Sequence, residues 1–148
     1  MTTSADITQA IERLCQSYIK DGLAKDAYAI NNGLCEDFAT DLMATLAKPA
    51  GMEMLCNESF MNPDHDSWDW ALLEKHWNIL PPDGLTQSQV DAVRFGGHAF
   101  LVFEGRFYDA ECPAGVHSFF DLPLFQKPLQ RALEALSAPH VSSRKPKP

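Results

Sequence analysis

The segment "GGHAFLVFEGRFYDAECP", residues 96 to 113, constrains the fold more than any other part of the chain. Aromatic and β-branched residues cluster on both sides of Glu104-Gly105, a variant of the Asp-Gly pair that forms tight hairpin turns. The segment therefore predicts two antiparallel strands. With Glu104 and Gly105 as the two turn residues, Phe103 pairs with Arg106, and the remaining pairs follow outward from this one.

This register decides which side chains share a face of the hairpin. Side chains alternate between the two faces, and directly opposed residues point the same way. His98 then faces Glu111, and Asp109 is its diagonal neighbour on the same face, at roughly 7–8 Å. Leu101 and Phe103 lie on the other face. Either carboxylate could orient the imidazole and stabilise its charged form. The alternative is an exposed histidine with no chemical role.

Helical patterns dominate the rest of the chain. One amphipathic helix is predicted over residues 4–20, and its inward stripe is Ile7, Ile11, Leu14 and Tyr18. Further helices are predicted over residues 34–47, 67–77, 86–93 and 128–136. The helix over residues 86–93 begins with a capping-box pattern at Thr86 and Gln89. The order predicts a single α+β domain over residues 1–139, followed by a disordered basic tail, residues 140–148.

Cys35 stands at the predicted start of the second helix, directly after the polar turn "NNG". Free cysteine is among the most buried residue types, so one interpretation is an inert core thiol. A helix N-terminus, however, lowers the pKa of a thiol through its unpaired N–H groups and dipole, and a nearby imidazolium lowers it further. The chain order of thiol, imidazole and carboxylate is that of nucleophile, base and orienting group.

The segments "NNGLCEDFA" and "GHAFLVFEGRFYDAE" resemble the papain-like cysteine hydrolase superfamily, and most closely its compact transglutaminase-like branch. The resemblance implies N-terminal helices and a nucleophile helix that packs on a small antiparallel sheet. It implies Cys35 as the nucleophile, His98 as general base and then acid, and Asp109 as the orienting group. The glutamine-led motif of papains and a tryptophan after the nucleophile are missing from the sequence.

Three further residues are candidates for supporting roles at this site. Glu111 is the reserve for the third catalytic role, because the simple hairpin register puts it opposite His98. Asn31 and Asn32 could supply a second oxyanion donor beside the backbone N–H of Cys35. The alternative for both asparagines is that they only form the turn before the helix.

Composition and charge exclude several classes of function. The net charge is −8, and three basic residues lie within the last five, so the body of the chain is more acidic still. An acidic body without a basic stripe argues against nucleic-acid binding. With no signal-peptide pattern and no long apolar stretch, we expect a cytoplasmic protein that does not cross a membrane. The four cysteines form no CxxC pair, which argues against disulfides and structural zinc.

The sequence predicts a cysteine-dependent hydrolase or acyl-transfer enzyme that acts on an amide, peptide or isopeptide bond without metal or cofactor. A peptide or protein is the expected substrate. The alternative is a catalytically inactive papain-like fold that serves as an acidic protein-binding or inhibitory module. A calcium site in the acidic segment Asp64, His65, Asp66 and Asp69 is disfavoured, because the spacing lacks the glycine and terminal glutamate of a calcium loop.

Overall fold

Residues 1–64 and 66–137, which the computed structural model describes, form six α-helices, two 3₁₀-helices and four strands. The helices are α1 (Ser4–Lys20), α2 (Ala27–Asn31), α3 (Cys35–Thr45), α4 (Trp70–Trp77), α5 (Gln87–Asp91) and α6 (Pro123–Ser137), and the 3₁₀-helices are η1 (Asn57–Phe60) and η2 (Phe119–Asp121). The strands are β1 (Glu53–Cys56), β2 (Ala99–Phe103), β3 (Arg106–Asp109) and β4 (Cys112–Val116). The predicted α+β class is confirmed, while the predicted tail, residues 140–148, lies outside the described residues.

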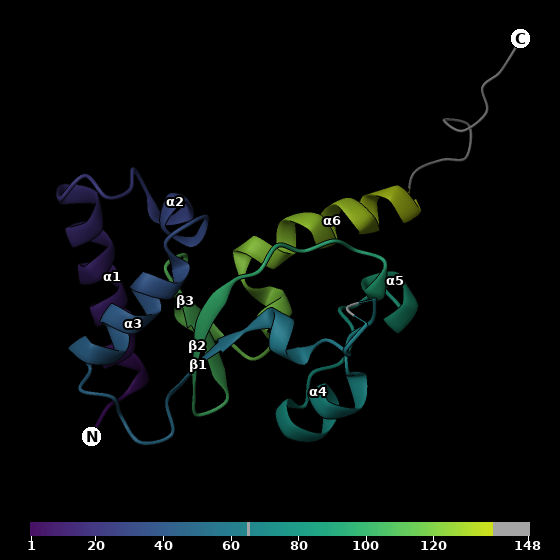
Figure 1. The fold of residues 1–148 in the computed structure, drawn as a ribbon, viewed down its shortest axis with the longest axis horizontal. Coiled ribbons are helices and arrows are strands. Elements are labelled where there is room, and N and C mark those ends of the chain that lie inside the picture. Colours follow the sequence, from purple (N-terminus) through teal and green to yellow (C-terminus); the bar gives the residue numbers. More distant parts are fainter. Residues whose placement is uncertain (65, 138–148) are drawn as a thin grey trace, which may run out of the picture.

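The sheet is antiparallel, with its strands in chain order β1-β2-β3-β4. At its centre the predicted hairpin is confirmed, because Phe103 pairs with Arg106 and Val102 with Phe107. The turn residues Glu104 and Gly105 have φ of 49° and 77°, and positive φ at both central residues is the mark of the tight hairpin turn. Figure 1 shows α1, α2 and α3 on one side of the sheet and α4, α5 and α6 towards the other.

The prediction that Glu111 lies opposite His98 is wrong. Strand β3 ends at Asp109, which pairs with Cys112 of β4, so Ala110 and Glu111 form the turn between these two strands. The simple register assumed that β3 continues straight through residue 111. The chain reverses two residues earlier, and Asp109 is therefore the last carboxylate on the strand.

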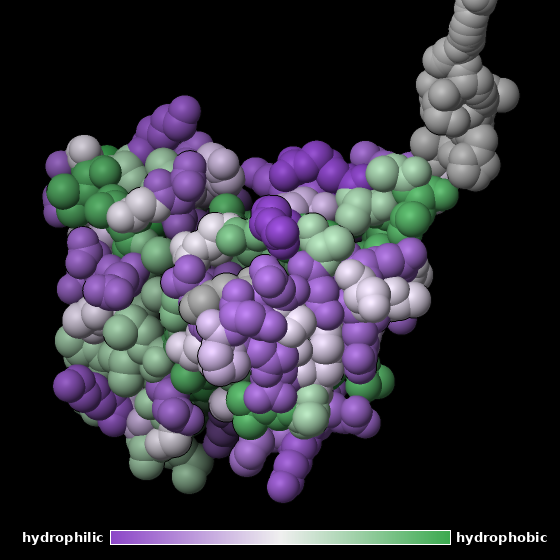
Figure 2. Space-filling model, turned by 45° about the vertical axis from the view of Figure 1, so that its right-hand side comes forward, coloured by the Kyte–Doolittle hydropathy of each residue, from purple (hydrophilic) through white to green (hydrophobic). Residues whose placement is uncertain are grey.

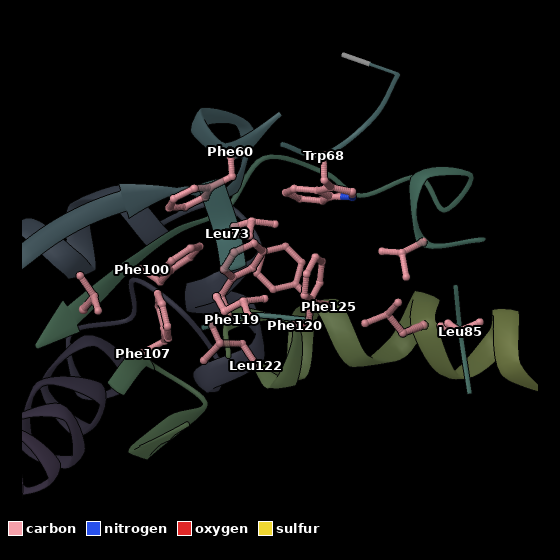
Figure 3. Packing of buried hydrophobic residues seen from close by; sticks show 14 residues of the cluster. Phe60, Trp68, Leu73, Leu85, Phe100, Phe107, Phe119, Phe120, Leu122 and Phe125 are labelled. Carbon is pink, nitrogen blue, oxygen red and sulfur yellow. The ribbon is translucent and has the colours of Figure 1, made fainter. Parts of the chain in front are cut away.

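Each face of the sheet carries its own hydrophobic cluster, as the alternation of side chains requires. Leu101, Phe103 and Tyr108 pack against the buried faces of α1, α2 and α3. Phe100, Val102 and Phe107 face the other way, into a cluster with residues from η1, η2, α4 and α6. Figure 3 shows the aromatic side chains of this second cluster meeting between the sheet and α6. The sheet is thus covered on both faces.

The predicted helices are confirmed, with changes at their ends. Helix α1 has the predicted bounds, and a capping box of Thr3 and Asp6 fixes its start. The Thr86–Gln89 capping box also starts α5 as predicted. Asp69 caps α4, which therefore begins at Trp70 rather than Ser67. Helix α6 begins at Pro123 rather than Pro128 and accommodates Pro128 in its interior.

Besides the two 3₁₀-helices, one α-helix and two strands were not predicted, and each has weak local signals. Helix α2 has only five residues and depends on Asp26, whose side chain accepts the N–H of Ala29. Strand β1 has only four residues, and two of them are exposed. Strand β4 contains Pro113 and Gly115, both unfavourable inside strands. The two short strands form because β2 and β3 are there to pair with them.

Hydrophilic side chains predominate on the face of the molecule that Figure 2 shows, with hydrophobic ones in smaller groups between them. Within the part of the chain that the structure describes, no helix is long and apolar enough to span a lipid bilayer.

The cluster around α4 and α6 contributes buried apolar contacts to the stability of the fold. Leu73 in α4 is fully buried in this cluster, whereas Leu80 is 57% exposed. We expect Leu73→Ala to lower the free energy of unfolding by about 2–5 kcal/mol, because it removes buried apolar contacts and leaves a cavity. The matched change Leu80→Ala should cost less than about 0.5 kcal/mol. Urea denaturation of both variants checks this, and equal losses would contradict the assigned core.

Candidate active site

Cys35 is the first residue of α3, and its thiol lies where this helix packs on β2. The side chain is half-buried, and Sγ accepts the backbone N–H of Ala99 at 3.4 Å. The N-cap residue Leu34 offers no side-chain acceptor to the helix start. The first N–H groups of a helix have no partner within it, so this end of α3 favours negative charge on the sulfur.

His98 lies directly before β2 and is only 1% exposed. Its Nε2 is 2.9 Å from Oδ2 of Asp109, the last residue of β3. Two aromatic rings pack against the imidazole. The Phe100 ring is tilted relative to it at a centroid distance of 6.0 Å, and the Phe125 ring makes a T-shaped contact at 5.6 Å. Nδ1 is also buried, and it has no hydrogen-bond partner among the described residues. Since Nε2 is bound to Asp109, Nδ1 is the nitrogen left to interact with Cys35.

The Cys35 thiol and the His98 imidazole each shift the pKa of the other. Interaction with the His98 side chain lowers the pKa of the Cys35 thiol, against the opposing effect of burial, and the Ala99 N–H lowers it further. Burial by itself would lower the pKa of His98, but Asp109 and Cys35 together raise it to about 9. Both shifts favour a thiolate beside an imidazolium over two neutral groups. This is the protonation state in which a cysteine is nucleophilic at neutral pH.

Asp109 is held from a second direction by the turn that follows it. Its Oδ1 accepts the backbone N–H of Glu111 at 2.9 Å, which leaves Oδ2 for His98. The Glu111 carboxylate in turn accepts the side-chain N–H of Asn31 at 3.0 Å. Glu111 therefore supports Asp109 and does not replace it beside the imidazole.

The two asparagines before Cys35 lie in different surroundings. Asn31 is 3% exposed and lines a small cavity together with Cys35, Ala99 and Asp109. This cavity has a volume of about 10 Å³, room for about one water molecule. Asn32 is exposed and ends α2, as expected of a turn residue. Of the two predicted oxyanion donors, only Asn31 lies beside the thiol.

Asn57, the first residue of η1, belongs to the site and was missed from the sequence. It is 1% exposed, and its Oδ1 accepts the backbone N–H of His98 at 2.8 Å. Recognising it required strand β1, because the end of β1 is what brings Asn57 beside the start of β2. A lone asparagine after an unpredicted strand gives no signal of its own.

The other three cysteines provide a contrast with Cys35, and all four are free thiols. Cys15 is buried, and its thiol donates to the carbonyl of Ala110 at 3.4 Å. Burial and the nearby Asp109 raise the pKa of Cys15 to about 11. Burial also raises the pKa of Cys112. The surroundings thus lower the pKa of the Cys35 thiol and raise the pKa of the Cys15 and Cys112 thiols.

Among residues 1–64 and 66–137, no group of three or more His, Cys, Asp or Glu side chains is arranged to hold a metal ion. His65, part of the acidic segment weighed as a calcium site, lies outside the described residues.

No known protein family, curated protein sequence or solved structure matches this chain. The papain-like resemblance therefore stays a prediction. What supports a chemical role is the arrangement of side chains at the junction of α3, β2 and β3.

A titration of the His98 ring tests the electrostatics of this site. Its pKa of about 9 means that the imidazole stays charged through neutral pH. We expect Cys35→Ser to lower this pKa, since the sulfur is one of the groups that raise it, and Asp109→Asn to lower it as well. The pH dependence of the ring-proton chemical shifts measures all three values, with His98→Gln to assign the signal. A wild-type value near the ordinary 6.5 would contradict the arrangement.

Proposed function

We propose that the chain is a cysteine-dependent hydrolase or acyl-transfer enzyme that acts on an amide, peptide or isopeptide bond. The observation that carries the proposal is the imidazole of His98. The ring is buried and bound through Nε2 to Asp109, and its Nδ1 has no hydrogen-bond partner within residues 1–64 and 66–137. The same side chain lowers the pKa of the Cys35 thiol. A structural histidine would have both ring nitrogens satisfied, because a buried polar atom without a partner costs stability.

The chemistry follows from the protonation states. The Cys35 thiolate attacks the carbonyl carbon, and the negative charge moves to the carbonyl oxygen. The backbone N–H of Cys35, at the start of α3, has no acceptor among the described residues and is positioned to stabilise that oxyanion. The imidazolium of His98 then donates its Nδ1 proton to the leaving amine as the C–N bond breaks. A thioester on Cys35 and a neutral imidazole remain.

The second half of the reaction reverses these roles. Neutral His98 takes a proton from water or from an amine, which attacks the thioester carbon and releases Cys35 as the thiolate. Water completes a hydrolysis, and an amine completes an acyl transfer. Asp109 keeps the same ring orientation throughout, since it holds Nε2 and leaves Nδ1 to face the reaction.

The papain-like, transglutaminase-like relationship is part of this proposal. It is supported by the order of nucleophile helix, histidine strand and aspartate strand, and by the packing of α3 on β2. We propose a peptide or protein substrate, because the Cys35 side chain opens to solvent while the cavity behind it holds about one water molecule. A substrate must therefore approach from the outer side of the thiol.

Alkylation with iodoacetamide tests the activation of the thiol. At about pH 6–7 an ordinary thiol is mostly protonated and reacts slowly. Cys35 should be labelled first and selectively, as located by peptide mass spectrometry, and Cys15 should resist. In His98→Asn, the rate at Cys35 should fall to that of Cys56. A wild-type Cys35 that reacts no faster than Cys56 would favour the alternative, an inactive fold that serves as an acidic protein-binding or inhibitory module.

Formation of an acyl-enzyme tests the chemistry itself. p-Nitrophenyl acetate should acetylate wild-type Cys35, detected as a thioester by intact mass and peptide mapping. His98→Asn should slow this acylation by about 10²–10⁴-fold, the usual contribution of a positioned acid or base. Cys35→Ala should give no adduct at this position, and Cys56→Ala should behave as wild type. Equal acylation of the His98→Asn variant and the wild type would contradict the assigned role of the imidazole.

A further inference from the structure

His98 is attached to a part of the backbone that has little structure of its own. Residues 94–98 belong to no helix or strand, and Gly96 and Gly97 come immediately before the histidine. Glycine is the residue that loses most conformational freedom on folding, so this segment is costly to hold in one conformation. Asp109 and the packed aromatic rings fix the imidazole, but they do not fix the backbone that carries it.

Asn57 provides that restraint from a different strand end. Its side-chain oxygen accepts the N–H of His98 at 2.8 Å, and its side-chain nitrogen donates to the carbonyl of Gly96 at 3.1 Å. Its own backbone N–H donates to the carbonyl of His98 at 3.3 Å. One buried residue thus makes three hydrogen bonds to a stretch of three residues and spans both glycines.

We infer that Asn57 is a positioning residue for the reaction of Cys35, because it holds the backbone of His98 at the place from which Nδ1 meets the thiol. The inference rests on the proposed function. Asn57 acts through the backbone, whereas Asp109 acts through the ring. Both restraints are needed, since the ring can rotate within a fixed backbone and the backbone can shift while the ring keeps its partner.

A second asparagine supplies a matched control. Asn62 is half-buried, and its side-chain N–H groups donate to Oγ of Ser67 at 2.8 Å and to the carbonyl of Trp68 at 3.3 Å. Like Asn57, it restrains irregular backbone through its side-chain amide, but its hydrogen bonds go to Ser67 and Trp68 and not to the segment that carries His98. The Asn62→Ala variant therefore measures how much stability is lost when an asparagine no longer restrains a loop, while the hydrogen bonds of Asn57 to Gly96 and His98 remain.

The experiment compares the pH profile of Cys35 alkylation by iodoacetamide in the wild type, Asn57→Ala and Asn62→Ala. We expect the Asn57→Ala profile to move towards higher pH by about one unit, which is about a tenfold loss of rate on the acidic side. Asn62→Ala should melt at a lower temperature than the wild type and keep the wild-type profile. If Asn57→Ala and Asn62→Ala both lose stability while both keep the wild-type profile, the inference is overturned and Asn57 is only structural.

A second variant covers the case in which Asn57→Ala does not fold. Asn57→Ser retains a polar group for one of the buried partners, yet its hydroxyl is too short to reach both Gly96 and His98. Its profile should move in the same direction, and an unchanged profile overturns the inference. Failure of the proposed function looks different, because wild-type Cys35 would then already react no faster than Cys56.

Discussion

The pairing of His98 with Asp109 is the interaction on which the candidate site depends. Both groups are almost fully buried, and an isolated buried charge is far too costly to persist. Their 2.9 Å contact lets the imidazole carry a proton inside the protein and fixes which nitrogen remains for Cys35. A buried ion pair of this kind contributes little net stability. Its value to the protein therefore lies in the ring orientation and charge state that it maintains.

The fold brings this pair to the thiol through the geometry of a sheet that is covered on both faces. Cys35 arrives on α3, from the layer of α1, α2 and α3. His98 packs against Phe100 and Phe125 of the other cluster, and its partner Asp109 is the last residue of β3. The nucleophile and the base thus come from opposite layers and meet at one end of β2 and β3. Neither layer alone contains the site.

The sequence was sufficient to predict the helices and strands that have strong local patterns. The apolar stripe of α1 and the capping box at Thr86 indicate helices, and the Glu104-Gly105 turn defines the central register. This register and the polar turn before Cys35 led to Cys35, His98 and Asp109, which the structure brings to one place. The place of Glu111 and the role of Asn57 were beyond local patterns, because they depend on β4 and β1. Those short strands form through pairing with the neighbouring strands of the sheet, and their own sequences show no alternating hydrophobic pattern that would predict them.

The ultraviolet absorbance of the Cys35 thiolate shows whether His98 holds the sulfur in its charged form, since it reports this charge without a reagent. The difference between wild type and Cys35→Ala, followed against pH, isolates this one thiol from the other three. We expect the thiolate signal to persist well below the ordinary thiol pKa of about 8.5 and to be lost at neutral pH when His98 is replaced by asparagine. A wild-type thiol that titrates in the ordinary range, unaffected by that replacement, would contradict this expectation.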